Sequence, residues 1–298
     1  MNISDIVKIV ANKENFTTIR HYIEFCKSFL EFVVNGLQAT IISQNENHYR
    51  FFQYKTDGYF NITRPINSQL MYTAEHIFKI ENEFPIILKE MKDASHDDTS
   101  REIIKRSIYT IQQSVGASLD ALPAGQSNIA RKISGDLFER FIQVLINEIG
   151  VKCESGTIQV PVYIDKEFQF NMSYQHDLLI YKNSELKVIG SVKTSSKDRI
   201  DKVFMDKFLY CKLTNTALPH IAIFLNDVQR KNGRSEHKYG VNATFLPGHF
   251  KVYTVKLNPL DGVYYCDIRP NMITDELLKK HIKTIDYFFT DDIWRLIR

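Results

Sequence analysis

Two short apolar runs joined by a tight polar turn constrain the fold of this chain more than any other feature. The runs span 178–181 and 186–192; Asp177 precedes the first, and Lys193 follows the second. Apolar runs of strand length on either side of a short polar turn are typical of adjacent antiparallel strands. The pattern therefore predicts that the Asp177 carboxylate and the Lys193 ammonium lie side by side at one end of a sheet.

An acid and a lysine in that arrangement indicate a defined chemistry. A carboxylate can hold a divalent metal ion, and a neighbouring ammonium can orient or deprotonate a water molecule. These are the minimum requirements for metal-assisted hydrolysis of a phosphodiester. Alternatively, Asp177 is only a strand-end carboxylate and Lys193 only the first solvated residue after a strand. The position of Lys193 at the end of an apolar strand favours the site.

Length and composition set wide limits. The 298 residues suffice for one large domain or two small ones. A hydrophobic content of 44% is ordinary for a globular chain, and a net charge of +3 permits nucleic-acid binding without requiring it. The four cysteines form no CxxC pair, and the chain has no signal-peptide pattern and no apolar run of about 18 residues. We therefore expect a cytoplasmic protein with reduced thiols.

Several enzyme classes lack their sequence signatures here. There is no phosphate-binding P-loop, no glycine-rich dinucleotide loop and no serine-hydrolase nucleophile motif. Histidines and cysteines do not show the spacing of a zinc site. NTP-driven, hydride-transfer and serine-based chemistry therefore have no support in the sequence.

The chain divides best near the segment 116–127, which combines two glycines and a proline. Residues 1–120 are expected to be a mainly helical N-terminal region with a small β insertion. Residues 121–298 are expected to form the core that carries the site. The expected N-terminal elements are helices at 21–34, 72–90 and 100–115 and β segments within 40–63.

The core is predicted to be an α/β unit, with a mixed central β-sheet flanked by helices on both faces. Its expected elements are a helix at 128–148, strands at 157–165, 168–181 and 186–193, a helix at 200–213, a strand at 219–226, a charged loop at 229–238, a strand near 250–256 and a final helix near 274–287. Gly135 is expected to let the first of these helices approach the sheet closely.

Asp177 together with the triplet Ser191-Val192-Lys193 resembles the PD-(D/E)xK nuclease core. Serine stands where that core usually has an acid two residues before the lysine. This replacement is similar to one branch of type II restriction endonucleases, the NgoMIV and EcoRII group, which reads CCGG- and CCNGG-type sites. The chain departs from the motif at His176, where the family has proline.

The resemblance implies where the missing acid comes from. In that branch a following helix supplies it thirteen or fourteen residues after the lysine, and Asp206 is the thirteenth residue after Lys193. A further acid is implied on the long preceding helix, where Glu139 is well placed. Both acids have an ordinary alternative as solvated carboxylates on helix surfaces.

The implied cofactor is Mg²⁺. The resemblance implies that Asp177, the backbone carbonyl of Val192 and an acid from Asp206 or Glu139 hold the ion, with Lys193 beside the scissile phosphate.

A basic–acidic–basic group follows the lysine at Lys197, Asp198 and Arg199. A guanidinium offers two donors to a guanine edge, and a carboxylate accepts from the cytosine amino group. The resemblance implies that these residues read G·C pairs. Further DNA contacts are expected from Lys202, Arg230, Lys231 and Arg234. The alternative is that these charges are solvated loops.

The implied function is Mg²⁺-dependent cleavage of double-stranded DNA at a short C/G-containing palindrome, leaving 5′-phosphates and 5′ overhangs. A symmetric site implies a homodimer, and a restriction–modification system implies a cognate DNA methyltransferase. The N-terminal region is expected to support DNA contact or dimer formation. The apolar runs 285–289 and 293–294 are candidates for an interface or for burial within one chain. The alternatives are a structure-specific repair or recombination nuclease, and a catalytically inactive DNA-binding module.

Overall fold

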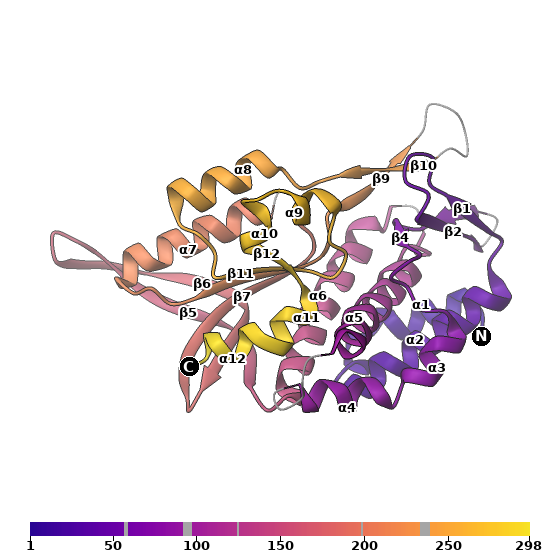
Figure 1. The fold of residues 1–298 in the computed structure, drawn as a ribbon, viewed down its shortest axis with the longest axis horizontal. Helices are drawn as coiled ribbons and strands as arrows, with labels where there is room; N and C mark the ends of the chain where they lie inside the picture. The colour runs from indigo at the N-terminus through magenta and orange to yellow at the C-terminus, as the bar shows by residue number, and fades with distance from the viewer. Residues whose placement is uncertain (57–58, 92–96, 124, 198, 233–238) are drawn as a thin grey trace.

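The computed structural model describes residues 1–298 except 57–58, 92–96, 124, 198 and 233–238. A central sheet is flanked by helices, and a helical N-terminal region with its own small sheet lies beside it (Figure 1). The N-terminal elements are α1 (Ile3–Ala11), α2 (Ile19–Gly36), β1 (Ala39–Ile42), β2 (Tyr49–Thr56), β3 (Tyr59–Ile62), β4 (Ile66–Asn67), α3 (Ala74–Ile80), α4 (Glu83–Glu90) and α5 (Asp98–Leu119).

The remaining elements follow from residue 127 onward. They are α6 (Ser127–Glu148), β5 (Lys152–Ile164), β6 (Glu167–Lys182), β7 (Glu185–Ser195), α7 (Ile200–Thr214), β8 (His220–Asn226), β9 (Val228–Asn232), β10 (Tyr239–Ala243), α8 (Pro247–Val252), β11 (Gly262–Tyr265), α9 (Pro270–Thr274), α10 (Leu278–His281), β12 (Ile282–Thr284), α11 (Ile285–Tyr287) and α12 (Ile293–Leu296). The predicted mixed α/β core and the helical N-terminal region are confirmed.

The central sheet has the strand order β12-β11-β8-β7-β6-β5. Strands β5, β6 and β7 pair antiparallel, whereas β7, β8, β11 and β12 pair parallel. Strand β7 is therefore the junction between the two kinds of pairing. Strand β6 is joined to β7 by a tight turn, which antiparallel pairing allows. Strand β8 is joined to β7 through α7, because parallel strands need a crossover connection.

The two antiparallel hairpins of the central sheet, β5–β6 and β6–β7, each turn through two residues with positive φ. Asp165 and Lys166 close β5–β6 with φ of 49° and 69°, and Asn183 and Ser184 close β6–β7 with φ of 49° and 66°. Two successive positive-φ residues are typical of the turn whose twist matches that of paired strands. The turn predicted after residue 181 is therefore present, and it sets the register of β7 against β6.

Strand β8 is buried along its whole length and shows how the sheet separates two cores. Ile221, Ile223 and Leu225 belong to the large apolar cluster shared with the N-terminal helices and α6. The alternate residues Ala222 and Phe224 belong to a second cluster with α7 and α8. This period of two matches a central parallel strand covered on both faces.

The large apolar cluster runs without interruption across residue 120. It includes residues of α1, α2 and α5 as well as α6 and the central sheet. Two buried polar contacts add to it, because Tyr49 and Asn67 both donate to the Asp267 carboxylate, at 2.8 and 2.9 Å. Burial raises the pKa of Asp267 to about 6. The division near residue 120 stays a prediction, and the packing joins the two regions closely.

Three predictions about local structure were wrong. The segment near 250–256, expected to be a strand, is helical in α8 and the following turn, because Phe250 packs against Phe204 and Phe245. The final helix expected at 274–287 is instead broken into α9, α10, β12 and α11. Residues 229–232, expected to be loop, form strand β9, which pairs with β10.

No helix among the described residues is long and apolar enough to cross a membrane.

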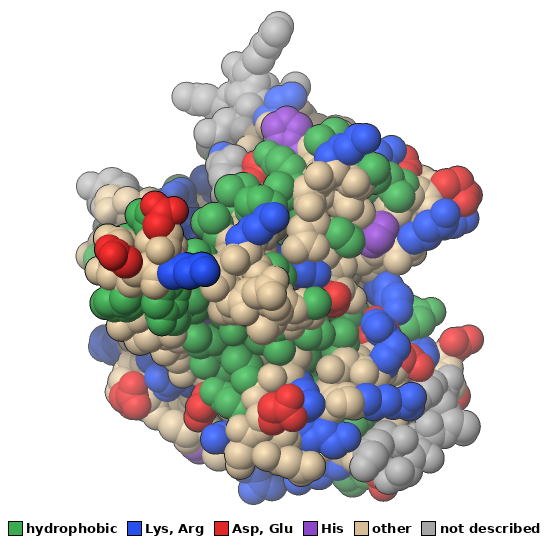
Figure 2. Space-filling view, turned by 90° about the vertical axis from the view of Figure 1, so that its left-hand side faces the viewer, with side chains coloured by type: hydrophobic (Ala, Val, Ile, Leu, Met, Phe, Trp, Pro, Cys, Tyr) green, Lys and Arg blue, Asp and Glu red, His purple; other side chains and the backbone are tan. Residues whose placement is uncertain are grey.

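The hairpin β5–β6 reaches beyond the helices that cover the rest of the sheet (Figure 1). Strand β6 pairs with β5 along its whole length but with β7 only from Leu178 onward. The outer half of the hairpin is therefore a two-stranded ribbon. Figure 2 looks at the side toward which this ribbon points and shows exposed hydrophobic side chains there.

Arg64 ties the N-terminal sheet to the helices that follow it. Its backbone N–H and its guanidinium donate to Asp120 at 2.7 to 2.9 Å, and Nη1 donates to Ser134 Oγ at 3.2 Å. Gly116 on α5 leaves room for this arrangement, because a Cβ there would lie 2.3 Å from Arg64 Nη1. By contrast, a Cβ at Gly135 would meet no atom within 4 Å. Gly135 is thus not required for close packing, which corrects the expectation from the sequence.

These two glycines give a matched test. Gly116→Ala should lower the free energy of unfolding by about 2 kcal/mol, because it displaces a partly buried guanidinium from its partners. Gly135→Ala should leave it unchanged or raise it by up to about 1 kcal/mol through helix propensity. Urea unfolding of the two variants measures both effects. Equal destabilisation by both would show that the contact of Gly116 with Arg64 does not matter.

Candidate active site

Asp177 lies on β6 directly before the first residue that pairs with β7. Its position is held on both sides. The side-chain amide of Gln143, on α6, donates to the Asp177 backbone carbonyl at 2.8 Å. The backbone N–H of Val192 donates to Asp177 Oδ2 at 2.8 Å. These contacts and the pairing of β6 hold Asp177 in place, so its carboxylate lies at a defined position on the sheet.

Lys193 brings two carboxylates together. Its Nζ lies 2.5 Å from Asp177 Oδ2 and 2.8 Å from Glu139 Oε1. Glu139 and Gln143 are four residues apart on α6, so they face the sheet from the same side of the helix. The structure therefore brings together Asp177, Lys193 and Glu139 from three elements, as the strand pairing and the helix position predict.

Asp206 approaches from α7. Its side chain is 26% exposed and lies 4.0 Å from Lys202 Nζ, one turn earlier on the helix. Burial raises the pKa of Asp206, Lys202 opposes the increase, and Asp177 adds to it. The influence of Asp177 and Lys193 on this pKa places Asp206 within electrostatic range of the site. The direct contacts of Lys193, however, go to Asp177 and Glu139.

The charges at the site are unbalanced toward the negative. Burial and the nearby Asp177 raise the pKa of Glu139. Burial also lowers the pKa of Lys193, but Asp177 and Glu139 together outweigh it, so this pKa lies above its ordinary value. The ammonium is consequently held in its charged form. Asp177 and Glu139 thus share the Lys193 ammonium, and Asp206 lies beside Lys202. Three carboxylates against two ammonium groups leave an excess of negative charge, which attracts a further cation.

The donor set fits a divalent metal ion. Carboxylate and carbonyl oxygens are the ligands that Mg²⁺ prefers. Asp177 and Glu139 already converge on one cationic atom, Lys193 Nζ. Within the described part of the chain, no three His, Cys, Asp or Glu side chains are grouped closely enough to bind a metal by themselves. Asp177, the carbonyl of Val192 and one of Asp206 or Glu139 are the groups that could hold the ion.

His176, which directly precedes Asp177, is 4% exposed and faces an aromatic cluster. The rings of Tyr174, Tyr210 and His220 lie with centroids 6.0 to 6.4 Å from it. Burial lowers the pKa of His176 to about 4, so the ring is neutral at physiological pH. Sequence reasoning missed this cluster. The alternation of Tyr174 and His176 along β6 was the signal for it.

The predicted DNA-binding residues after β7 lie on the protein surface. Lys197 donates through its backbone N–H to Ser195 Oγ at 3.2 Å and through Nζ to Gln229 Oε1 at 3.2 Å. Arg199 is exposed at the start of α7, and the Lys202 side chain is 72% exposed. Asp198 lies outside the described residues.

The other predicted contacts belong to β9. Arg230 donates to the carbonyl of Ile62 at 2.5 Å, and its guanidinium lies 5.7 Å from the centre of the Tyr239 ring. Lys231 is exposed. Arg234 lies outside the described residues. Arg230 therefore joins this hairpin to the N-terminal sheet, and Lys197 joins the segment after β7 to the same hairpin through Gln229.

The contact between the N-terminal sheet and β9–β10 was not predicted from the sequence. Asn45 pairs with Val241 as a strand backbone would, since its amide donates to Val241 O at 2.8 Å and accepts from Val241 N at 2.9 Å. Tyr49, Phe51 and Val228 form an apolar cluster across the same boundary. The partners are nearly 200 residues apart, and no sequence periodicity indicates such a contact.

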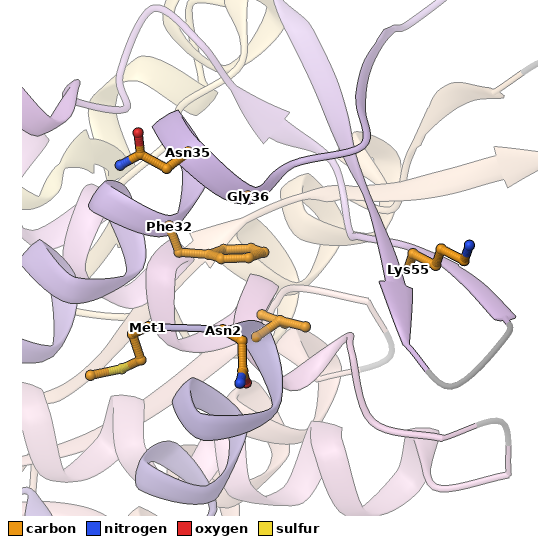
Figure 3. Close-up of a pocket in the computed structure, with 7 residues that line it drawn as sticks. Met1, Asn2, Phe32, Asn35, Gly36 and Lys55 are labelled. Atoms are coloured by element: carbon orange, nitrogen blue, oxygen red, sulfur yellow. The ribbon is translucent and has the colours of Figure 1, made fainter.

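A pocket of about 300 Å³ lies elsewhere in the protein. It is lined by the N-terminus and by residues of α1, α2 and β2 (Figure 3). Its lining residues are Met1, Asn2, Ile3, Phe32, Asn35, Gly36 and Lys55. No carboxylate lines it, so it offers no alternative metal site.

Comparison with known proteins identifies the fold. No family model and no curated protein matches the sequence. The chain is similar to the crystal structure of the type IIP restriction endonuclease Kpn2I, with a TM-score of 0.71 and 18% identity over 99% of this chain and 97% of that one. A complex of the restriction endonuclease PspGI with substrate DNA matches with a TM-score of 0.47 and 13% identity, over 74% of this chain and 90% of that one. The chain has the restriction-endonuclease-like fold.

The raised pKa of Asp206 gives a test of the site in the metal-free protein. The unfolded-state pKa of aspartate is about 3.9, and the folded-state pKa lies above the ordinary value. Between the unfolded-state pKa and the folded-state pKa, the folded protein therefore binds more protons than the unfolded chain. The free energy of unfolding falls as pH rises through this range, because Asp206 ionises in the folded protein. Asp206→Asn in EDTA should be more stable than the wild type at pH 8, and this advantage should vanish as pH falls below about 4.

Thermal unfolding over that pH range measures the difference. Asp201→Asn, on the first turn of the same helix and half-exposed, is the matched control and should show no such pH-dependent gain. If Asp206→Asn lowers the free energy of unfolding at pH 8, ionised Asp206 is not destabilised by burial and by the Asp177 carboxylate.

Proposed function

We propose that this protein is a type II restriction endonuclease that cleaves double-stranded DNA sequence-specifically with Mg²⁺. The observation that carries the proposal is the contact of Lys193 with both Asp177 and Glu139 beside the β6–β7 pairing. The match of nearly the whole chain to the fold of a type IIP restriction endonuclease supports it.

The metal would be held by Asp177, the Val192 carbonyl and Asp206 or Glu139. When bound, Mg²⁺ neutralises negative charge on the scissile phosphate and lowers the pKa of a water molecule. Asp177 is oriented for this by the N–H of Val192 and, through its backbone, by Gln143. These two contacts thus orient the proposed ligand before a metal ion binds.

Lys193 would act as a cation rather than as a base. Its raised pKa keeps the ammonium protonated at neutral pH, so it can donate hydrogen bonds but not accept a proton. It would position the attacking water and stabilise the negative charge that develops on the phosphoryl oxygens. In-line attack would leave a 5′-phosphate and a 3′-hydroxyl.

The recognised sequence would be a short palindrome containing C·G pairs. Lys197, Asp198 and Arg199 would read base edges, since they follow directly on the strand that carries Lys193. Lys202 and Lys231 would contact phosphates, as would Arg230 and Arg234. A 5′ overhang is expected from the family resemblance. Two symmetric cuts call for a homodimer, and protection of host DNA calls for a cognate methyltransferase within a restriction–modification system.

Digestion of a phage DNA of mixed sequence tests the proposal. The wild type should give discrete fragments with Mg²⁺ and none with EDTA. Lys193→Ala should lose at least about 100-fold in cleavage rate, while Lys187→Ala, near the opposite end of β7, should cut normally. Sequencing the fragment ends gives the recognition site. Binding of DNA without cleavage by the wild type would favour the inactive binding module, and cleavage only at flaps, nicks or junctions would favour the repair nuclease.

Base-reading and phosphate-contacting cations should respond differently to mutation. Arg199→Ala should cost about 1–3 kcal/mol of binding to the cognate duplex and relax specificity at one base pair. Lys202→Ala should weaken binding to all sequences alike and reduce the slope of log affinity against log salt by about one. Titrations of cognate and mismatched duplexes in Ca²⁺ at several salt concentrations separate the two patterns. Identical patterns for both variants would contradict the assignment.

A further inference from the structure

A buried carboxyl group without a hydrogen-bond donor lies at the end of β8. Asp227 joins β8 to β9, and its side chain is 1% exposed. Within the described part of the chain, no other residue donates a hydrogen bond to either of its carboxyl oxygens. An ionised carboxylate without donors is costly in such a place, whereas the neutral acid is tolerated. The surroundings of Asp227 therefore favour its protonated form.

The guanidinium beside Asp227 is engaged by another acid. Arg269 Nε lies 3.8 Å from Asp227 Oδ1, which is beyond hydrogen-bond distance. Its Nη1 and Nη2 lie 2.7 and 2.8 Å from the two carboxylate oxygens of Glu46, in the connection between β1 and β2. His48 also approaches that carboxylate, with Nε2 3.8 Å from Glu46 Oε2. Because the fork of Arg269 is paired with Glu46, Asp227 gains only part of its attraction.

The remaining ionisable neighbours act in the same direction as burial. Burial raises the pKa of Asp227 to about 7, Arg269 opposes the increase, and Asp267 and Glu46 add to it. Tyr265, on β11, lies within electrostatic range of the same carboxyl. Burial raises the pKa of Tyr265 and Asp227 adds to the increase, so this hydroxyl stays protonated. Asp227 is therefore the group of this set whose charge changes near neutral pH.

Asp267 differs from Asp227 because it has hydrogen-bond donors. Tyr49 and Asn67 donate to its carboxylate at 2.8 and 2.9 Å, which stabilises the ionised form. Its pKa, about 6, accordingly lies below that of Asp227 although both groups are buried. Asp227 thus ionises beside a carboxylate that already carries its charge.

Backbone contacts join Asp227 to the segment that follows β7. We name residues 226–228 the junction. The carbonyl of Asp227 accepts from Thr244 N at 2.5 Å and from Thr244 Oγ1 at 2.7 Å. Thr244 Oγ1 lies 3.4 Å from Ser195 Oγ, which accepts from Lys197 N at 3.2 Å. A continuous series of hydrogen bonds therefore connects Asp227 to Lys197.

Residues on either side of Asp227 hold the same segment. The carbonyl of Asn226 accepts from Ser196 N at 3.3 Å, and Gln229 Oε1 accepts from Lys197 Nζ at 3.2 Å. The chain from Ser196 to Lys197 is thus attached to the junction and to the first turn of β9 beyond it. A displacement of the junction moves these two residues.

We infer that Asp227 is a proton-controlled positioning residue, which holds the base-reading segment 197–199 in place when neutral and releases it when ionised. The inference rests on the proposed function in one respect, namely that residues 197–199 read bases. Loss of the proton to solvent leaves a buried charge, which is stabilised by reaching water or by drawing Arg269 away from Glu46. Either movement displaces the junction and lowers the discrimination between DNA sequences.

Binding titrations at several pH values test the inference. With a pKa of about 7, about a tenth of Asp227 is ionised at pH 6 and nearly all of it at pH 8.5. We compare affinities in Ca²⁺ for the duplex identified by fragment-end sequencing and for a duplex with one mismatch. Their ratio should fall about tenfold between these pH values in the wild type, which is the discrimination carried by one base pair. In Asp227→Asn, whose side chain is always neutral, the ratio should keep its pH 6 value.

Asp98→Asn removes an exposed acid at the start of α5 and is the matched control. It should follow the wild type at every pH. A constant ratio in a wild type that cleaves DNA overturns the inference and leaves the proposed nuclease intact. The same pH dependence in Asp227→Asn as in the wild type also overturns the inference.

Amide hydrogen exchange gives a second readout that needs neither DNA nor cleavage. Protection of the Ser196 and Lys197 amides, corrected for the intrinsic exchange rate, should fall at least about tenfold from pH 6 to pH 8.5 in the wild type. It should stay constant in Asp227→Asn. The amides of the buried strand β8 should keep their protection, which separates local displacement from general destabilisation.

The exchange measurement also separates failure of the inference from failure of the proposed function. A wild type without sequence-specific DNA binding contradicts the proposed function, and exchange then decides whether Asp227 controls the segment. Constant protection of Ser196 and Lys197 in the wild type overturns the inference whether or not the protein cuts DNA. This result needs no variant, so it holds even if Asp227→Asn fails to fold.

Discussion

The site depends on the change of pairing at β7. This strand is antiparallel to β6, and so Lys193 at its far end returns to Asp177 after a two-residue turn. It is parallel to β8, and so the chain must leave the sheet through α7, which carries Asp206. Helix α6 packs against the same strands and supplies Glu139. Each proposed catalytic group follows from one of these connections, which explains why residues far apart in sequence meet at one place.

The electrostatics of the site follow from that convergence. Two carboxylates share the ammonium of Lys193, and a third lies within range on α7. Partial burial makes the negative charge costly, because it raises the pKa of both Glu139 and Asp206. A protein tolerates such an arrangement when a cation relieves it. The same geometry that favours a metal ion therefore limits the stability of the metal-free protein.

Much of the core could be predicted from the sequence because its signals are local. Apolar runs, a polar turn and helical periodicity indicated β6, β7, α7 and β8 close to their observed bounds. The prediction of a strand at 250–256 was wrong. The alternation of apolar and polar residues there resembles a strand, whereas the packing of Phe250 makes the segment helical. No local sequence pattern indicates the pairing of Asn45 with Val241. The roles of Glu139, Asp206 and the basic residues stay predictions, since position alone does not show chemistry.

The two hairpin turns differ in how much variation in length they can accept. Adding one residue to β7 would shift its register by one position and send Lys193 to the opposite face of the sheet, away from Asp177. The segment between these two residues is therefore fixed in length. At the other end of β6, residues can be added or removed in pairs around Asp165 and Lys166 without moving the carboxylate. Related chains could then differ in the reach of this hairpin while keeping the same catalytic pair.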